Sequence, residues 1–144
     1  MASTLTGSCL CGAIRYTVSA PITELRACHC THCQKASGAS GSVNAVIPSA
    51  AFRLTQGTPK CFDTAAASGR TLHRYFCGDC GSPIYSQRPT ALDMLSLRVG
   101  TLDHAPDAKI AVSIWTKSAQ PWAHIDPASK QVAGQPDAPA AKVS

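Results

Sequence analysis

The sequence predicts an all-β domain, built as a β-sandwich or a folded sheet that bound zinc staples together. Three observations predict this class: short stretches that alternate polar and apolar residues, turns rich in glycine and proline between them, and eight cysteines gathered mostly at those turns. No segment keeps a helical period over ten or more residues. A chain of 144 residues has the length of one domain.

Composition excludes several classes of protein. Hydrophobic residues make up 44% of the chain and charged residues 15%, and no apolar run approaches the roughly 18 residues of a membrane-spanning helix. Residues 1–7 lack the basic and apolar stretches of a secretory signal, so we expect a soluble, cytoplasmic protein without a membrane partner. The net charge of +5 is scattered over the chain, so no nucleic-acid partner is expected.

The expected elements follow from the pattern in chain order. Residues 5–19 predict two strands joined by a turn at residues 9–12, and residues 21–27 predict a connector or a strand. Residues 34–37 predict one helical turn that Gly38 ends. The remaining strand candidates are residues 42–47, 52–55, 70–76, 94–100 and 110–115.

The C-terminal part has a different composition. From residue 128 the chain is rich in alanine, proline, glycine, lysine and aspartate and offers little to bury. We therefore expect residues 1–127 to form a single zinc-binding domain and residues 128–144 to form a disordered tail.

Four of the cysteines form two pairs, Cys9 with Cys11 and Cys77 with Cys80, each followed by a glycine. Reducing compartments disfavour disulfides, so thiols at such short spacings indicate metal binding. A glycine at a tight turn can take a positive φ and let backbone N–H groups point at metal-bound thiolates. Each pair is half of a tetrahedral zinc site, and joining the two halves clamps the N-terminal hairpin to a segment roughly seventy residues away.

Three further cysteines, Cys28, Cys30 and Cys33, lie within one short segment. Three protein ligands are what a catalytic zinc uses, with water or substrate in the fourth position. The spacing therefore predicts an open site. His29 and His32 inside the segment are alternative ligands, or proton relays near neutral pH, or solvent-facing residues without a role.

Cys61 leaves a second interpretation open. As a fourth sulfur beside Cys28, Cys30 and Cys33 it makes both metal sites structural, and the protein is then a noncatalytic zinc module that binds a protein or a nucleic acid. Otherwise Cys61 is a packed or free thiol. Three thiolates donate much negative charge to zinc, which favours holding another sulfur over generating hydroxide, and hence favours thiol chemistry over hydrolysis.

Several motifs follow one another in a recognisable order. They are Cys9-Leu-Cys-Gly, Tyr16, Cys28-His-Cys-Thr-His-Cys-Gln-Lys-Ala-Ser-Gly38, Phe76-Cys-Gly-Asp-Cys-Gly-Ser82, Val99-Gly-Thr-Leu-Asp103 and Ile114-Trp-Thr-Lys-Ser118. In this order they resemble the glutathione-dependent formaldehyde-activating enzyme family (GFA domain), which also includes centromere-protein-V-like members. The resemblance covers about residues 7–127.

The resemblance implies a zinc-stapled β fold similar to that of small zinc-containing chaperones of Rab GTPases. It assigns one set of cysteines to a structural zinc: Cys9, Cys11, Cys77 and Cys80. It assigns a second set to a catalytic zinc: Cys28, Cys30 and Cys33. The implied activity is that of a zinc-dependent carbon–sulfur lyase in aldehyde detoxification, which reversibly adds glutathione or another thiol to formaldehyde or a similar small aldehyde.

Cationic side chains near the metal motifs are candidates to bind the carboxylates of such a thiol. Lys35, Arg70 and Arg74 are the nearest in sequence. Gln34 stands where the family commonly has a basic residue.

Overall fold

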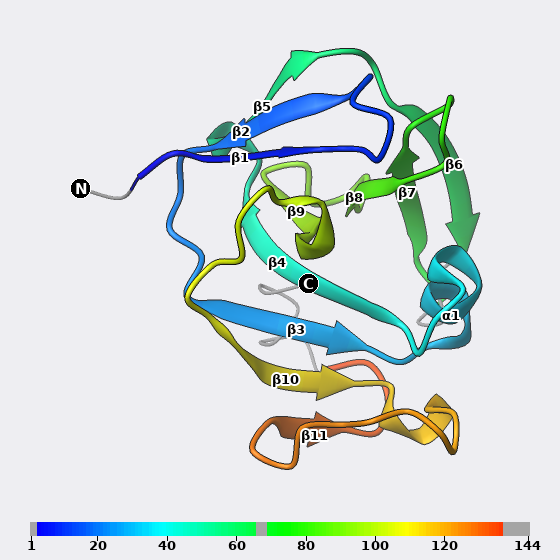
Figure 1. Ribbon diagram of the computed structural model, residues 1–144. Helices are drawn as coiled ribbons and strands as arrows, with labels where there is room; N and C mark the ends of the chain where they lie inside the picture. The colour runs from blue at the N-terminus through cyan, green and yellow to red at the C-terminus, as the bar shows by residue number, and fades with distance from the viewer. Residues whose placement is uncertain (1–2, 66–68, 137–144) are drawn as a thin grey trace.

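The computed structural model describes residues 3–65 and 69–136 and shows a mostly β protein (Figure 1). These residues form two sheets. The smaller sheet has the order β1-β2-β5, with β1 at Leu5–Ser8, β2 at Arg15–Val18 and β5 at Phe52–Gln56. The larger sheet has, in spatial order, β11 (Lys130–Val132), β10 (Lys109–Ile114), β3 (Glu24–Cys28), β4 (Ser42–Pro48), β9 (Met94–Arg98), β8 (Pro83–Gln87), β7 (Thr71–Phe76) and β6 (Lys60–Ala65).

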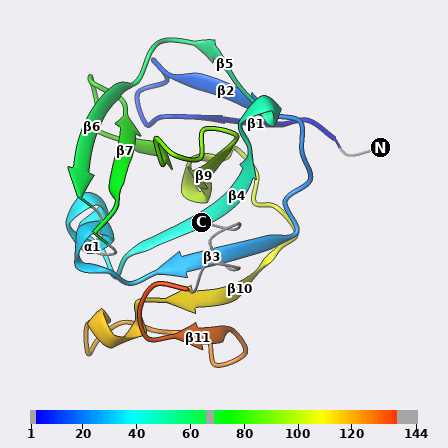
Figure 2. The same ribbon diagram turned by 180° about the vertical axis from the view of Figure 1, so that it is seen from behind.

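The strands run mainly antiparallel. In the larger sheet only the pairs β3–β10 and β10–β11 are parallel. The larger sheet bends along its length, with β10 and β11 at one end and β6 and β7 at the other. Strands β1 and β2 of the smaller sheet lie on the side of the molecule away from β10 and β11 (Figures 1 and 2). The predicted all-β class with a folded sheet is therefore confirmed.

The main core lies between the two sheets. Tyr16 and Val18 of β2 meet Ile84 of β8 and Leu97 of β9, and each of these side chains is at most 1% exposed. Alternate residues of a strand point to opposite faces, so the alternating pattern of β2 sends these two side chains inward. Burial of each such side chain contributes about 2 kcal/mol to folding.

Among the described residues there is one α-helix, α1, at Thr31–Ser37. It begins after Cys30, its N-cap, and ends before Gly38, so it is longer than the single predicted turn but ends at the predicted glycine. The 3-10 helices are η1 (Ser49–Ala51), η2 (Val99–Thr101) and η3 (Thr116–Ser118). Within the described ranges, no helix has the length and apolar character needed to cross a membrane.

The predicted disordered tail does not hold for residues 128–136. β11 pairs in parallel with β10. The buried hydroxyls of Ser113, on β10, and Ser129, just before β11, lie 2.8 Å apart. The prediction from composition was wrong because strand pairing depends on backbone groups. The edge of β10 has backbone N–H and C=O groups that a polar strand can also hydrogen-bond. The rest of the expected tail, residues 137–144, lies outside the described residues.

Candidate metal centres and their cavity

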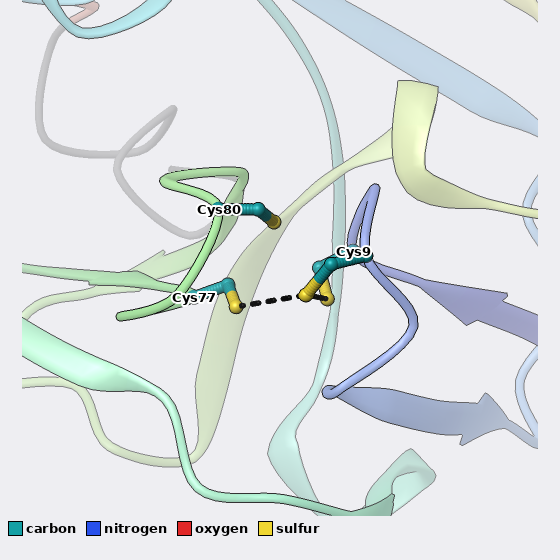
Figure 3. Close-up of side chains that lie close together, drawn as sticks. Cys9, Cys77 and Cys80 are labelled. Carbon is teal, nitrogen blue, oxygen red and sulfur yellow. Dashed lines mark hydrogen bonds between the residues drawn. The ribbon is translucent and has the colours of Figure 1, made fainter.

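The turn between β1 and β2 meets the turn between β7 and β8 at four cysteines. The sulfur atoms of Cys9, Cys11, Cys77 and Cys80 all lie within 4.8 Å of one another. Cys11 Sγ is 3.6 Å from Cys9 Sγ and 3.8 Å from Cys77 Sγ. Figure 3 shows the side chains of Cys9, Cys77 and Cys80 converging from the two turns. Sulfurs placed tetrahedrally around zinc, with bonds of about 2.3 Å, lie about 3.8 Å apart, so this group fits a zinc ion.

Backbone N–H groups point at these sulfurs. Ile14 N–H donates to Cys9 Sγ at 3.2 Å, and Asp79 N–H donates to Cys77 Sγ at 3.4 Å. The glycine after each cysteine pair has a φ of +80°, the left-handed conformation that the sequence predicted for these turns. Hydrogen bonds to sulfur stabilise the thiolate, which is the form that binds a metal.

Ser82 links the two turns. Its hydroxyl accepts a hydrogen bond from Leu10 N–H at 3.0 Å and lies 3.2 Å from Cys80 Sγ. The hydrogen bonds from Ser82 lower the pKa of Cys80 to about 5. Cys80 is therefore ready to act as a thiolate ligand at neutral pH.

The second group consists of Cys28, Cys30 and Cys33, whose sulfur atoms also lie within 4.8 Å of one another. Cys28 ends β3, Cys30 is the N-cap of α1, and Cys33 lies in the first turn of that helix, where its N–H donates to Cys30 Sγ at 3.4 Å. All three side chains are buried. The strand end and the helix start thus bring together the three sulfurs of the predicted open site.

Three sulfurs this close cannot all be negatively charged without a cation. Hydrogen bonding with Cys30 raises the pKa of Cys28, and hydrogen bonding with Cys28 lowers the pKa of Cys33, because one thiol keeps its proton and shares it with its neighbours. A divalent ion replaces the shared protons and leaves one net negative charge on three thiolates. The donor set fits zinc with one coordination position free of cysteine.

Cys61, His29 and His32 do not join this group. Cys61 lies on β6 in a separate cluster, so the structure brings no fourth cysteine to the three-sulfur site. His29 is 4% exposed, and its ring nitrogens have no hydrogen-bond partner among the described residues. It lines a cavity of about 90 Å³ on the face of β3 that carries Ala27, away from the sulfurs.

The three-sulfur group opens on a cavity of about 100 Å³ in the concave side of the larger sheet. Its wall is rich in positively charged side chains, because five arginines line it: Arg26, Arg70, Arg74, Arg88 and Arg98. A second cavity of about 380 Å³ shares Cys33, Arg74 and Arg98 with the first. Together they offer room next to the sulfurs for a ligand that carries negative charge.

Arg98 is held in place by hydrogen bonds from its guanidinium. Its Nη1 donates to Asn44 Oδ1 at 2.6 Å and to Ser86 Oγ at 3.2 Å. Burial lowers its pKa, and the charge of Cys33 acts in the opposite direction. Arg98 therefore places a positive charge beside the sulfurs and offsets the extra negative charge of three thiolates on a divalent ion.

Arg74 and Arg26 line the cavity from two different strands, β7 and β3. Arg74 Nη1 is buried and has no hydrogen-bond partner among the described residues, so it retains a donor for a ligand. Arg26 precedes Cys28 by two residues on β3, and both therefore face the cavity.

Only part of this wall was predictable from the sequence. Arg70 and Arg74 were predicted as carboxylate partners and do line the cavity, whereas Lys35 does not. Arg26, Arg88 and Arg98 also line the cavity but were not predicted. The alternation along β3 was a signal for Arg26, but the other two reach the cavity through the sheet order, which the sequence does not show.

Gln34 has a positioning role. Its side-chain nitrogen donates to the carbonyl oxygens of His29 at 2.7 Å and Ser118 at 2.9 Å, and its oxygen accepts from Gln120 at 2.8 Å. These bonds fix the start of α1 against η3. A neutral amide therefore holds the three-cysteine turn in place.

Trp115, between β10 and η3, also lines the cavity. Its φ is +56°, a left-handed conformation that costs energy for a bulky residue. Its backbone N–H donates to Gly134 O at 3.2 Å, and its indole N–H donates to Gln135 Oε1 at 3.0 Å, so two hydrogen bonds hold this conformation. Gln135 also lines the cavity, so residues predicted as tail form part of its wall.

The fold and these two groups define a class: a mostly β protein whose cysteine clusters can hold zinc. The family described as glutathione-dependent formaldehyde-activating enzyme (GFA) matches residues 4–118. The chain belongs to this family, as its motifs indicated.

Two relatives carry the name of the same family. A protein of Sordaria macrospora is 32% identical over 76 residues, which is 53% of this chain and 31% of that protein. A protein of Penicillium rubens is 28% identical over 79 residues, which is 55% of this chain and 40% of that protein. The chain thus matches less than half the length of either relative.

A solved structure shares the fold. The crystal structure of a Rhodobacter sphaeroides protein superposes with a TM-score of 0.53 at 18% identity, over 72% of this chain and 99% of that one. At this identity the likeness concerns the fold alone.

Proposed function

We propose that this chain is a zinc-dependent carbon–sulfur lyase or synthase that joins glutathione to formaldehyde, or a related thiol to a small aldehyde, and also cleaves the adduct. Membership of the family supports glutathione and formaldehyde as reactants. The observation that carries the proposal is the opening of the three-sulfur group, Cys28, Cys30 and Cys33, on an arginine-lined cavity. Glutathione combines a thiol with carboxylates, which are the chemical groups that such a site binds.

The two cysteine groups have different roles in this proposal. Cys9, Cys11, Cys77 and Cys80 hold a structural zinc, while Cys28, Cys30 and Cys33 hold the catalytic one. When bound by three cysteines, zinc supplies a free coordination position that lowers the pKa of an entering thiol below about 8.5. Arg98 stabilises the negative charge of this assembly from the cavity wall.

The arginines orient the thiol through its carboxylates. Arg74 offers a buried, unbonded Nη1, and Arg26 and Arg70 lie in the same wall. Held in this way, the thiolate sulfur attacks the aldehyde carbon. The carbon–sulfur bond forms as the carbonyl π bond breaks, and the oxygen takes a proton from water, because neither His29 nor His32 lines this cavity. The reverse steps release the aldehyde.

Thiol chemistry of this kind requires free glutathione and reduced ligands. All eight cysteines are free of disulfides in the structure. A reducing compartment such as the cytoplasm is therefore the proposed location. The version of the noncatalytic alternative with Cys61 as a fourth sulfur is not favoured, because Cys61 lies in a separate cluster.

The test measures formation of the glutathione–formaldehyde adduct by exchange NMR on the zinc-loaded protein. Arg74→Gln removes one carboxylate partner, so we expect the KM for glutathione to rise about tenfold or more, while the KM for uncharged 2-mercaptoethanol stays the same. Arg53→Gln, on the exposed part of β5, is the matched control and changes neither.

Two results contradict the proposal. One is wild-type protein that does not accelerate adduct formation with either thiol. The other is a cobalt-substituted protein whose thiolate absorption does not change when glutathione is added, because a free coordination position must respond to a thiol.

A further inference from the structure

The β6–β7 hairpin carries a third cluster of metal-binding side chains. Cys61 and Asp63 are two residues apart on β6 and therefore point to the same face. His73 of β7 pairs directly with Asp63, and Tyr75 pairs with Cys61. A thiol, a carboxylate and an imidazole thus meet on one face of a regular antiparallel pair, and their ligand atoms lie within 4.8 Å of one another.

The contacts within the cluster are short. Cys61 Sγ donates to Asp63 Oδ1 at 3.3 Å, and His73 Nδ1 lies 2.5 Å from the same oxygen. The side chain of Asp63 is 61% exposed and that of His73 is 23% exposed. An ion can therefore enter from solvent, and water can complete its coordination.

This cluster is separate from the catalytic cavity. Leu72 and Arg74, the two neighbours of His73 on β7, line that cavity, so His73 projects from the opposite face of the strand. Cys61 belongs to neither of the two larger sulfur groups. An ion bound here would join β6 to β7 on the face of the hairpin opposite to Arg74.

We propose that Cys61, Asp63 and His73 form a third metal site, which binds a divalent transition ion of the zinc type. The ligand set selects this class, because a thiolate and an imidazole favour zinc and its neighbours, whereas magnesium and calcium require oxygen ligands. A thiolate and a carboxylate also neutralise the charge of a divalent ion beside a neutral imidazole.

The required adjustment is small. Ligands bound tetrahedrally at about 2.0–2.3 Å lie about 3.3–3.8 Å apart, a spacing that Cys61 and Asp63 already have. The contact between Asp63 and His73 must open, which rotation of the exposed Asp63 side chain allows. The arrangement does not suit a nucleophilic cysteine, because Asp63, and not His73, is the partner of the thiol.

The test uses alkylation of Cys61 by iodoacetamide in the zinc-loaded protein, followed by mass spectrometry. Bound zinc blocks the thiol, so we expect alkylation to slow about tenfold when free Zn²⁺ is about ten times the dissociation constant. His73→Gln should remove this protection. His104→Gln, which replaces an exposed histidine outside the cluster, should retain it.

A second measurement makes the result independent of reactivity. In calorimetric titration, the wild-type protein should take up one more Zn²⁺ per chain than Cys61→Ser. The proposal is overturned if Zn²⁺ leaves the alkylation rate of the wild type unchanged, or if His73→Gln is protected as well as the wild type. Neither readout depends on turnover, so a failure here is distinct from a failure of the proposed lyase activity.

Discussion

The four-sulfur group and the three-sulfur group differ in what they connect. Cys11 and Cys77 lie 66 residues apart, and their group ties the turn of the smaller sheet to a turn of the larger one. Cys28, Cys30 and Cys33 come from one strand end and the helix that follows it. Closing a long loop contributes to the stability of the fold, whereas a local group can lose its metal without releasing distant segments.

The surroundings of the two groups differ as well. The three-sulfur group faces a cavity with five arginines, and Arg98 interacts electrostatically with all three of its cysteines. The four-sulfur group lies between its own two turns with Cys11 exposed, and backbone N–H groups and Ser82 are its polar partners. In the proposed function, identical ligand atoms therefore support stability in one place and are available for chemistry in the other.

The largest expected effect is that of Cys77→Ser. This variant removes one ligand from the group that joins the two sheets, and structural zinc contributes on the order of 10 kcal/mol to the folding of small domains. We expect loss of the bound metal and of the cooperative unfolding transition, measured by zinc content and circular dichroism. The control Arg53→Gln, at an exposed position of β5, should change the free energy of unfolding by less than about 0.5 kcal/mol.

Cys30→Ser should separate the two groups. Serine preserves the N-cap of α1, because its oxygen can accept the Cys33 N–H, but it removes a sulfur ligand. We expect loss of the metal at this site and a fall in thiol-dependent turnover by more than about 100-fold, with the cooperative unfolding transition retained. An unfolded variant, like the one expected for Cys77→Ser, would show that this group is structural too.

The smallest expected effect is that of Gln135→Ala. It removes the hydrogen bond to the Trp115 indole and should lower the free energy of unfolding by about 1 kcal/mol and raise the KM for glutathione about threefold. Gln131→Ala, at an exposed position of β11, is the control in thermal unfolding and kinetics. Equal effects of the two changes would mean that the C-terminal segment does not shape the cavity.

Much of the fold was accessible from local patterns. The alternation at β2 and β9 predicted strands because one face of each is buried against the core. β8 was missed although Ile84 is fully buried, because its five residues follow directly on the cysteine turn and read as part of it. β11 was missed because its stability comes from pairing with β10 and not from its own side chains.

The grouping of the cysteines was also predictable, since the spacing within each motif places two or three sulfurs on one turn. That these sulfurs bind zinc stays a prediction. The exclusion of Cys61 from the three-sulfur group needed the structure, because only the register of β6 against β7 shows that it faces Asp63 and His73.

The sequence alone determined the all-β class, the family and the three short cysteine motifs, because these depend on local spacing and strand alternation. Only the tertiary structure decided which arginines surround the sulfurs and which residues close the cavity. Arg26, Arg74 and Arg98 lie on three strands whose order in the sheet differs from their order in the chain. Their meeting depends on how the sheet folds over a shared core, an interaction between distant segments that no short stretch of sequence contains.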